Sequence, residues 1–281
     1  MEYTVLANGV KVPLLGIGTF LLSLEETERS VYEAIRCGYR LIDTANAYLN
    51  EVAVGRAIKK ALSDGLVTRE ELFVSTKLWP TVYEDESAVA DTLRRLGLDY
   101  VDLLFIHQPA GNFVSGWRLL EKAYEKGQAR SLGLSNFHGG KLETVLKNAK
   151  VFPHVIQLET HPYYARHAQM ERLSEYGTRL MGWYPLGHGN ISLLSEPVFL
   201  ELSKKYCKSV VQIVLRWAVQ YGVITIPGSK DPKHIASNFD IFDFSLTREE
   251  MDRIATLDGK QRFYHADSRM EEGYAKMKLC I

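Results

Sequence analysis

The chain has 281 residues, of which 46% are hydrophobic and 24% are charged. This composition is typical of a globular protein and excludes the disordered, fibrous and disulfide-rich classes. Lys plus Arg and Asp plus Glu both number 34, so no excess positive charge favours nucleic acid as a partner. The opening residues MEYTVLANGV lack the pattern of a signal peptide, and no stretch approaches the roughly 20 apolar residues that cross a bilayer. We therefore expect a cytoplasmic protein without a membrane partner.

The cysteines and histidines indicate no disulfide framework and no metal site. Cys37, Cys207 and Cys280 are far apart and odd in number, which fits reduced intracellular thiols. The histidines, including His161 and His167, have neither zinc-protease spacing nor partnering cysteines.

The chain opens with a pattern that predicts a β-hairpin around Asn8-Gly9, and we expect this hairpin to cover the lower end of the fold. Eight apolar or β-branched runs then alternate with segments of helical periodicity. The predicted strands are residues 15–20, 40–45, 72–79, 101–108, 129–136, 155–161, 180–185 and 223–229. Eight repeated βα units predict an α/β fold, specifically a (β/α)8 TIM barrel. Because no linker rich in Pro, Gly or Ser interrupts the pattern, we expect a single domain over residues 1–281.

Helix boundaries are marked in the sequence as well. Two capping boxes, Ser23 with Glu26 and Thr247 with Glu250, predict helix starts, and Gly97 predicts a helix end. The helix that begins after Thr247 falls outside the eight repeats, so we expect extra helices beyond the barrel.

Four residues with complementary proton chemistry follow the second, third and fourth predicted strands: Asp43, Tyr48, Lys77 and His107. In such barrels the reactive groups lie at the carboxyl ends of the strands. We expect Asp43 and Lys77 at matching heights on adjacent strands, about 4.8 Å apart, as a buried ion pair. The ammonium is expected to lower the pKa of Tyr48 from about 10 toward the operating pH, which favours a general acid and base. His107 is expected to hydrogen-bond the substrate oxygen.

Each of these residues also has a purely structural explanation when it is taken alone. Asp43 can cap a turn, Lys77 can be a surface charge, and His107 can be a histidine at the barrel rim. Their joint occurrence at three consecutive strand ends favours one site over separate structural roles.

The later strands also end in polar or aromatic residues, which predicts a cofactor-binding surface. Ser135, Asn136 and Gln157 can hydrogen-bond a carboxamide, and the indole of Trp183 can stack on a flat ring. Backbone amides near Asp231 can hold phosphate at a helix start. For Trp183 the structural alternative is a core-filling side chain.

At these residues the sequence resembles the aldo-keto reductase family, from the VPLLGIGTF segment to the final helix. The segment DTANAYLNE, which carries Asp43 and Tyr48, looks like the family's first signature, STKLW carries Lys77, and IHQP carries His107. The resemblance implies reduction of aldehydes or ketones to alcohols by direct hydride transfer from NADPH. It implies that Asp43, Tyr48, Lys77 and His107 are the catalytic residues, with Tyr48 as the general acid.

The resemblance also implies residues for binding. The implied cofactor contacts are Thr19, Asp43, Ser135, Asn136, Gln157, Trp183, Tyr184, Leu186, Ser229, Lys230, His234 and Asn238. The implied substrate contacts are Phe20, Tyr48, Trp79, His107 and Phe113. Trp183 stands where the family often has tyrosine, and Tyr184 stands where it usually has serine.

The choice between NADPH and NADH depends on two departures from the family pattern. Gly228 and His234 stand where the family usually presents a lysine and an arginine to the 2′-phosphate of NADPH. Ser229, Lys230, Lys233 and a protonated His234 can compensate for the lost charges. We therefore expect NADPH, with NADH as the alternative.

The chain lacks the longer carboxyl-terminal loop of many mammalian members, so we expect an open pocket for small aldehydes, dicarbonyls or keto-sugars. We expect a monomer.

One alternative function is a cofactor-binding regulatory or sensor protein with little catalysis. The other is a lyase or isomerase in which Lys77 forms a Schiff base.

Overall fold

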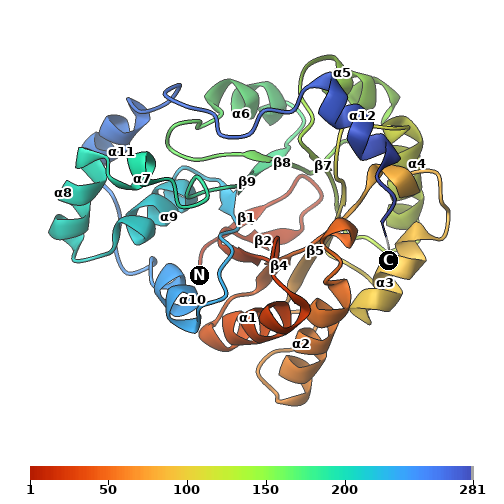
Figure 1. Cartoon of the computed structure of the whole chain (residues 1–281), viewed down its shortest axis with the longest axis horizontal. Helices are drawn as coiled ribbons and strands as arrows, with labels where there is room; N and C mark the ends of the chain where they lie inside the picture. The colour runs from red at the N-terminus through yellow and green to blue at the C-terminus, as the bar shows by residue number, and fades with distance from the viewer. Residues whose placement is uncertain (280–281) are drawn as a thin grey trace.

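A computed structural model describes residues 1–279, in which eight parallel strands form a nearly closed barrel surrounded by helices (Figure 1). The barrel strands are β3 (Gly16–Gly18), β4 (Leu41–Asp43), β5 (Phe73–Leu78), β6 (Leu103–Ile106), β7 (Leu132–Ser135), β8 (Val155–Glu159), β9 (Arg179–Trp183) and β10 (Ile224–Thr225). They follow one another in chain order around the sheet, and parallel bridges from Leu15 to Thr225 and from Gly18 to Gly228 bring the two edges together. The predicted (β/α)8 barrel is confirmed.

The barrel strands are almost entirely buried because side chains fill the interior and helices cover the outside. Each strand overlaps its predicted segment but is shorter than predicted, and β9 begins one residue before its segment. The difference is greatest for β10, which has two residues where the prediction had seven. The polar residues that follow the strands lie in loops at the mouth of the barrel instead of extending the sheet.

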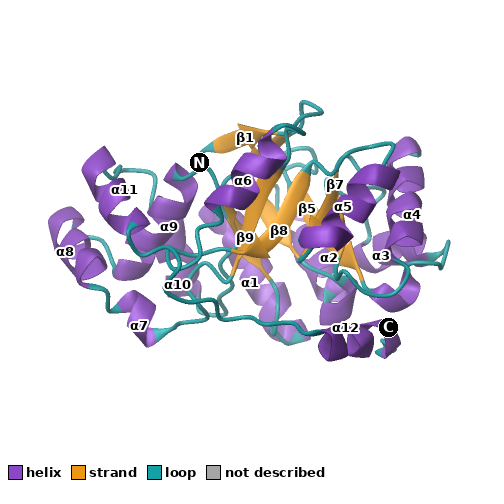
Figure 2. Ribbon diagram, turned by 90° about the horizontal axis from the view of Figure 1, so that it is seen from above, coloured by secondary structure: helices purple, strands orange, loops and turns teal. Residues whose placement is uncertain are grey.

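The predicted hairpin is confirmed at the amino-terminal end of the barrel. Strands β1 (Tyr3–Val5) and β2 (Lys11–Pro13) pair antiparallel, and Gly9 has the positive φ of 83° that the turn requires. The side chain of Asn8 donates to the carbonyl oxygen of Arg130, just before β7, at 2.9 Å. Figure 2 shows β1 at one end of the barrel and α12 at the other.

Helices surround the barrel and extend beyond it. They are α1 (Leu24–Cys37), α2 (Glu51–Ser63), α3 (Ala88–Leu96), α4 (Phe113–Glu125), α5 (Gly139–Asn148), α6 (His167–Ser174), α7 (Ile191–Leu194), α8 (Pro197–Tyr206), α9 (Val210–Gln220), α10 (Pro232–Phe239), α11 (Arg248–Ala255) and α12 (Ser268–Lys276), with 3-10 turns η1 (Asn46–Tyr48) and η2 (Pro80–Val82). Both predicted capping boxes are confirmed, at Ser23 and at Thr247. Gly97 ends α3 in the left-handed conformation, as predicted.

A second apolar cluster lies outside the barrel core. Helices α8, α9 and α11 enclose it with buried side chains that include Phe199, Trp217 and Ile254. This packing accounts for the helix that the sequence placed outside the eight repeats. Within residues 1–279, no helix combines the length and hydrophobicity needed to cross a bilayer.

The carboxyl-terminal segment 262–279, which we call the strap, lies across the mouth of the barrel and contains α12 (Figures 1 and 2). Tyr274 on α12 packs against Trp79 with ring centroids 5.2 Å apart, and Tyr264 packs against Trp183 at 5.3 Å. The short carboxyl-terminal segment therefore covers part of the mouth, because its aromatic side chains reach Trp79 and Trp183. The expectation of an open pocket stays a prediction.

Candidate active site

A buried ion pair lies at the carboxyl ends of β4 and β5. Lys77 Nζ is 2.6 Å from Asp43 Oδ2 and donates to the carbonyl oxygen of Thr44 at 2.8 Å, and both charged side chains are at most 3% exposed. The predicted pair is confirmed, but the predicted equal height is wrong. Asp43 is in register with Ser75, and Lys77 lies two residues nearer the mouth, opposite Phe105. The pair forms because the long lysine side chain reaches back to the neighbouring strand.

The second oxygen of the Asp43 carboxylate is also fixed. Asp43 Oδ1 accepts hydrogen bonds from Ser75 Oγ at 2.7 Å and from Gln157 Nε2 at 3.1 Å. Ser75 was not among the residues predicted for the site. Side chains alternate along a strand, so Ser75 lies on the same side of β5 as Lys77, two residues later. This spacing is the signal from which Ser75 could have been predicted. The Asp43 carboxylate is thus held by three partners: Lys77, Ser75 and the candidate cofactor residue Gln157.

Tyr48 lies beside this ion pair on the 3-10 turn η1. Its hydroxyl is 3.3 Å from Lys77 Nζ. Burial raises the pKa of Tyr48 above its ordinary value of 10.0, and the opposing effect of Lys77 does not offset it. The expectation of a lowered pKa is therefore wrong for this structure, because desolvation of a phenolate exceeds its attraction to the ammonium. The hydroxyl consequently keeps its proton at neutral pH.

Lys77 is charged in this environment. Burial opposes its charge, but Asp43 and the Tyr48 hydroxyl outweigh burial and raise the pKa of Lys77 above 10.5. A nucleophilic amine needs a lowered pKa. The raised pKa of Lys77 therefore argues against a role as a Schiff-base nucleophile.

His107 faces the tyrosine from the end of β6. Its ring centroid is 5.6 Å from that of Tyr48 and 5.0 Å from that of Trp79. Burial, together with the charge of Lys77, lowers the pKa of His107 well below 6.5, so the imidazole is neutral at pH 7. Its Nδ1 atom is buried and has no hydrogen-bond partner among the described residues.

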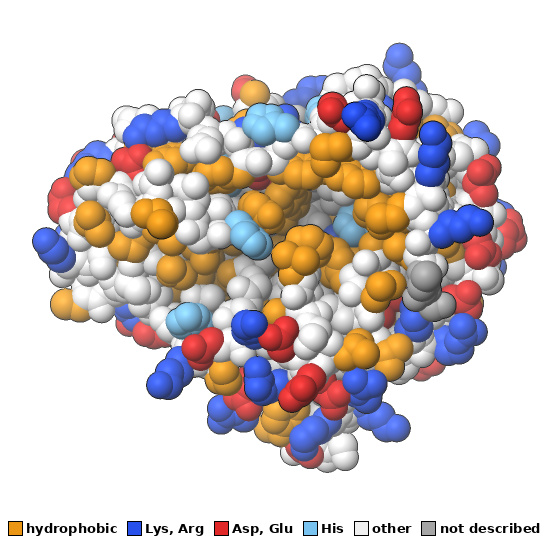
Figure 3. Space-filling view, viewed as in Figure 1, with side chains coloured by type: hydrophobic (Ala, Val, Ile, Leu, Met, Phe, Trp, Pro, Cys, Tyr) orange, Lys and Arg blue, Asp and Glu red, His pale blue; other side chains and the backbone are white. Residues whose placement is uncertain are grey.

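The predicted substrate contacts separate into two groups. Phe20 is 50% exposed and packs 5.0 Å from the Tyr48 ring, while Trp79 is buried between His107 and Tyr274. Phe113 packs against Phe137 at 5.4 Å, and no aromatic contact within residues 1–279 joins it to Tyr48 or Trp79. Figure 3 shows a hollow on this face that hydrophobic side chains border.

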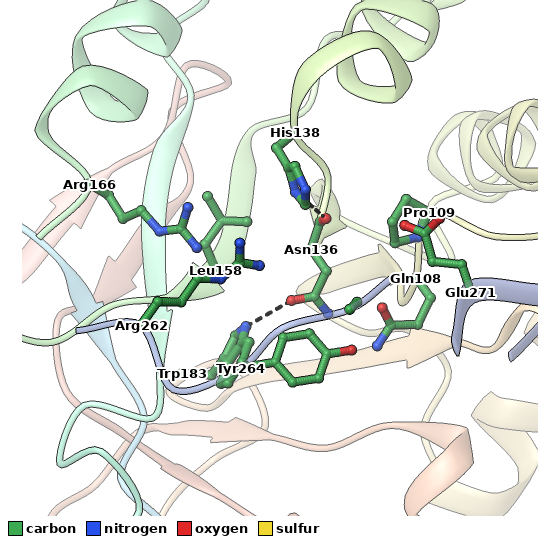
Figure 4. Close-up of a pocket in the computed structure, with 11 residues that line it drawn as sticks. Gln108, Pro109, Asn136, His138, Leu158, Arg166, Trp183, Arg262, Tyr264 and Glu271 are labelled. Atoms are coloured by element: carbon green, nitrogen blue, oxygen red, sulfur yellow. Dashed lines mark hydrogen bonds between the residues drawn. The ribbon is translucent and has the colours of Figure 1, made fainter. Parts of the chain in front are cut away.

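The predicted carboxamide-binding residues gather on β7, β8 and β9. Gln157 lies 3.5 Å from Ser135 Oγ, and Asn136 Nδ2 donates to the same hydroxyl at 3.3 Å. Asn136 has a positive φ of 67°, and its Oδ1 atom accepts from the Trp183 indole at 3.1 Å (Figure 4). Trp183 is half-buried at the mouth, so it is not simply core filler. We call Ser135, Asn136, Gln157 and Trp183 the amide cluster.

The remaining predicted cofactor residues lie along the rim of the barrel. Thr19 is fully buried, and its hydroxyl is 2.9 Å from that of Thr44. Asn238 is buried on α10, whereas His234 on the same helix is exposed. Tyr184 stacks on His188, Leu186 and Ser229 are half-buried, and the exposed Lys230 pairs with Glu26 at 2.9 Å.

A buried carboxylate that the sequence analysis missed fastens the strap to the barrel. Glu159, the last residue of β8, accepts from the backbone amides of Phe263 at 2.6 Å and of Tyr264 at 3.2 Å, and it contacts His161 Nε2 at 3.0 Å. Burial opposes its charge, but these hydrogen bonds together lower the pKa of Glu159. The available signal was an acidic residue directly after the apolar Leu158 in the predicted strand 155–161.

No group of three or more His, Cys, Asp or Glu side chains with the arrangement of a metal site occurs in residues 1–279. Cys37 is half-buried and Cys207 is exposed, and neither forms a disulfide. Cys280 lies outside the described residues.

The fold and the site define an α/β barrel whose acid–base cluster lies at the carboxyl ends of its strands. The family model of the aldo/keto reductase family matches residues 14–258. A glyoxal reductase of Bacillus subtilis is 42% identical over 262 residues, which cover 92% of this chain and 93% of that protein. A methylglyoxal reductase of Yersinia pestis is 38% identical over 261 residues, which cover 92% and 93%.

Solved structures agree with the sequence comparison. The crystal structure of a Bombyx mori aldo-keto reductase in complex with NADP has a TM-score of 0.87 and 34% identity, over 94% of this chain and 95% of that one. An aldo-keto reductase from a deep-sea metagenome library has a TM-score of 0.88 and 37% identity, over 93% and 97%. The chain belongs to the aldo/keto reductase family and is an oxidoreductase of the carbonyl-reducing kind.

Proposed function

We propose that the protein reduces small aldehydes, ketones and dicarbonyls to alcohols with a reduced nicotinamide cofactor, and that Tyr48 is the proton donor. The observation that carries this proposal is the 3.3 Å contact between the Tyr48 hydroxyl and Lys77 Nζ, with Lys77 anchored by Asp43 at 2.6 Å. An ammonium beside a phenol stabilises the phenolate that remains after the proton has left.

The residues present fit a nicotinamide. The half-exposed indole of Trp183 offers a flat surface, and the side chains of Ser135, Asn136 and Gln157 offer donors and acceptors for a carboxamide. A bound reduced nicotinamide supplies the hydride. We favour NADPH because Lys230, Lys233 and His234 are exposed at the start of α10 and can contact a 2′-phosphate.

The roles of the four catalytic candidates follow from their surroundings. Tyr48 donates its proton to the carbonyl oxygen, and Lys77 stabilises the resulting phenolate while Asp43 keeps Lys77 charged and oriented. Neutral His107 hydrogen-bonds the substrate oxygen and adds no second positive charge beside Lys77. The strap packs on Trp79 and Trp183 beside these groups, which limits their contact with water and strengthens their electrostatic interactions.

An assay of reduced-nicotinamide absorbance with glyoxal, methylglyoxal and a panel of uncharged aldehydes and ketones tests the proposal. We expect turnover of several small carbonyls. Tight cofactor binding without turnover of any carbonyl would contradict the proposal and favour the sensor alternative.

The directions of the two pKa shifts predict the pH profile. Reduction needs protonated Tyr48, so its rate is retained below the pKa of Tyr48, which burial raises above 10.0, and is lost above it. Neutral His107 persists above its lowered pKa. We therefore expect kcat/KM for reduction to stay within about twofold between about pH 6.5 and 9. Initial rates across this pH range measure kcat/KM. A fall in kcat/KM centred between about pH 7 and 8 would contradict the raised pKa of Tyr48.

Replacing His234 by arginine tests the proposed 2′-phosphate contact. His234 is exposed, so an arginine fits there, whereas a Cβ at Gly228 would lie 3.1 Å from the carbonyl oxygen of Gly18. A guanidinium binds phosphate through two parallel hydrogen bonds. We expect His234→Arg to tighten NADPH binding by about tenfold and to leave NADH binding unchanged, measured by fluorescence titration. An equal effect on both cofactors would remove position 234 from the 2′-phosphate site.

A further inference from the structure

A recess lies under the strap, and two residues of the amide cluster, Asn136 and Trp183, are part of its lining (Figure 4). Residues from four strand ends and from the strap line it: Gln108, Pro109, Asn136, His138, Leu158, Arg166, Trp183, Arg262, Tyr264, Ala266 and Glu271. Gln108 directly follows His107, so the recess and the candidate catalytic site share the end of β6.

Two guanidinium groups converge on this recess. Arg166, in the loop between β8 and α6, donates to the carbonyl oxygen of Glu159 and to the Tyr164 hydroxyl, both at 2.9 Å. Arg262 comes from the strap. The guanidinium carbons of both arginines lie over the ring of Tyr164, at 3.8 Å and 5.8 Å from its centroid. Figure 4 shows the two guanidinium groups on the same side of the recess.

The charge of these arginines is incompletely balanced. The nearest carboxylate, Glu159, is already engaged by the amides of Phe263 and Tyr264, and Arg262 Nε is 3.8 Å from it. This Nε atom is buried and has no hydrogen-bond partner among the described residues. Two positive charges at half-buried positions therefore face one carboxylate that is committed to holding the strap.

The other ionisable groups of the recess add no compensating negative charge. Glu271 pairs with Lys141 at 2.5 Å, so its charge is matched. Burial and the two arginines lower the pKa of His138, so this imidazole is neutral at pH 7. The recess thus carries a net positive charge. An anion that enters it relieves the repulsion between Arg166 and Arg262.

We propose that this recess is an anion subsite that binds the carboxylate or phosphate group of the carbonyl substrate. Arginine is suited to such groups because its planar fork forms parallel hydrogen bonds to two oxygens. The proposal rests on the proposed carbonyl reduction and narrows its substrate class to small carbonyl compounds that carry an anionic group. Arg166 and Arg262 are the specificity-determining residues.

The first test compares charged with uncharged substrates. Glyoxylate, succinic semialdehyde and glutaric semialdehyde are assayed beside uncharged aldehydes of the same carbon number. We expect kcat/KM to favour at least one of the charged aldehydes by about tenfold or more. In Arg166→Gln this preference is expected to fall by about tenfold, and in Arg166→Lys by less, because an ammonium keeps the charge without the fork.

Arg172→Gln is the matched control. Arg172 lies on α6, six residues after Arg166, and contacts Glu143 at 3.2 Å outside the recess. We expect this variant to keep the preference of the wild type. An equal loss of preference in Arg166→Gln and Arg172→Gln would overturn the assignment to the recess.

A binding measurement keeps the proposal testable without turnover. Inorganic phosphate is expected to raise the Tm of the wild type with the logarithm of its concentration above Kd, and to raise it less in Arg166→Gln and in Arg262→Gln. It is also expected to inhibit reduction of the charged aldehyde competitively and to leave reduction of the uncharged one unaffected. A rise in Tm without any substrate discrimination would overturn the substrate role and leave a site for free anions.

The outcomes separate this inference from the proposed function. Reduction of uncharged aldehydes without any preference for charged ones overturns the subsite alone. Failure to reduce either kind overturns the proposed carbonyl reduction.

Discussion

Replacing Tyr48 by phenylalanine is expected to lower kcat/KM for carbonyl reduction by about 10²- to 10⁴-fold, the usual contribution of a positioned general acid. The substitution deletes the hydroxyl 3.3 Å from Lys77 Nζ and keeps the ring, which packs 5.0 Å from Phe20 and 5.6 Å from His107. Ground-state cofactor binding should change by less than about twofold, because the ring contacts are retained. Steady-state kinetics and a cofactor titration of the same preparation measure both quantities.

Tyr32→Phe is the matched control for this substitution. The hydroxyl of Tyr32 also contacts a charged side chain, Asp64 at 2.6 Å, but it lies on α1 away from the mouth. We expect wild-type activity in this variant. If Tyr48→Phe kept more than about a tenth of the wild-type kcat/KM, the proton would have to come from another group, and the assignment of Tyr48 would be wrong.

The parts of the fold that local patterns encode were predictable from the sequence. Alternating apolar runs and helical segments predicted all eight barrel strands, and the Asn8-Gly9 turn predicted the hairpin. The capping boxes at Ser23 and Thr247 were confirmed because each one depends on four consecutive residues only. The pairing of Asp43 with Lys77 was predictable for a similar reason, since neighbouring parallel strands bring their ends together.

What the sequence did not predict depends on contacts between distant residues. The strap crosses the mouth because Glu159 accepts the amides of Phe263 and Tyr264, more than 100 positions away along the chain. No local pattern marks a carboxylate for that role. The pKa of Tyr48 is raised, whereas the sequence predicted a lowered pKa, for a related reason. The sequence shows that a lysine is near, but it does not show how much water the folded structure excludes from the hydroxyl, and this burial decides the direction of the shift.

Replacing Lys77 by methionine is expected to abolish reduction and to destabilise the protein by about 3–5 kcal/mol, the usual cost of removing one partner of a buried ion pair. Methionine has a similar length, so packing is largely preserved. The carboxylate of Asp43, only 2% exposed, is left without its counter-ion and keeps only the hydrogen bonds from Ser75 and Gln157. Urea unfolding followed by circular dichroism measures the change in the free energy of unfolding.

The double variant Asp43→Asn with Lys77→Met separates stability from catalysis. A neutral amide at position 43 removes the unpaired buried charge, and its oxygen still accepts from Ser75 and Gln157. We therefore expect most of the lost stability to return, because neutral replacement of a buried ion pair is often nearly neutral in free energy. Activity should stay lost, since no ammonium remains to stabilise the Tyr48 phenolate. Recovery of turnover in the double variant would show that the ion pair serves folding alone, whereas recovery of stability without turnover would show that Lys77 acts on the proton donor.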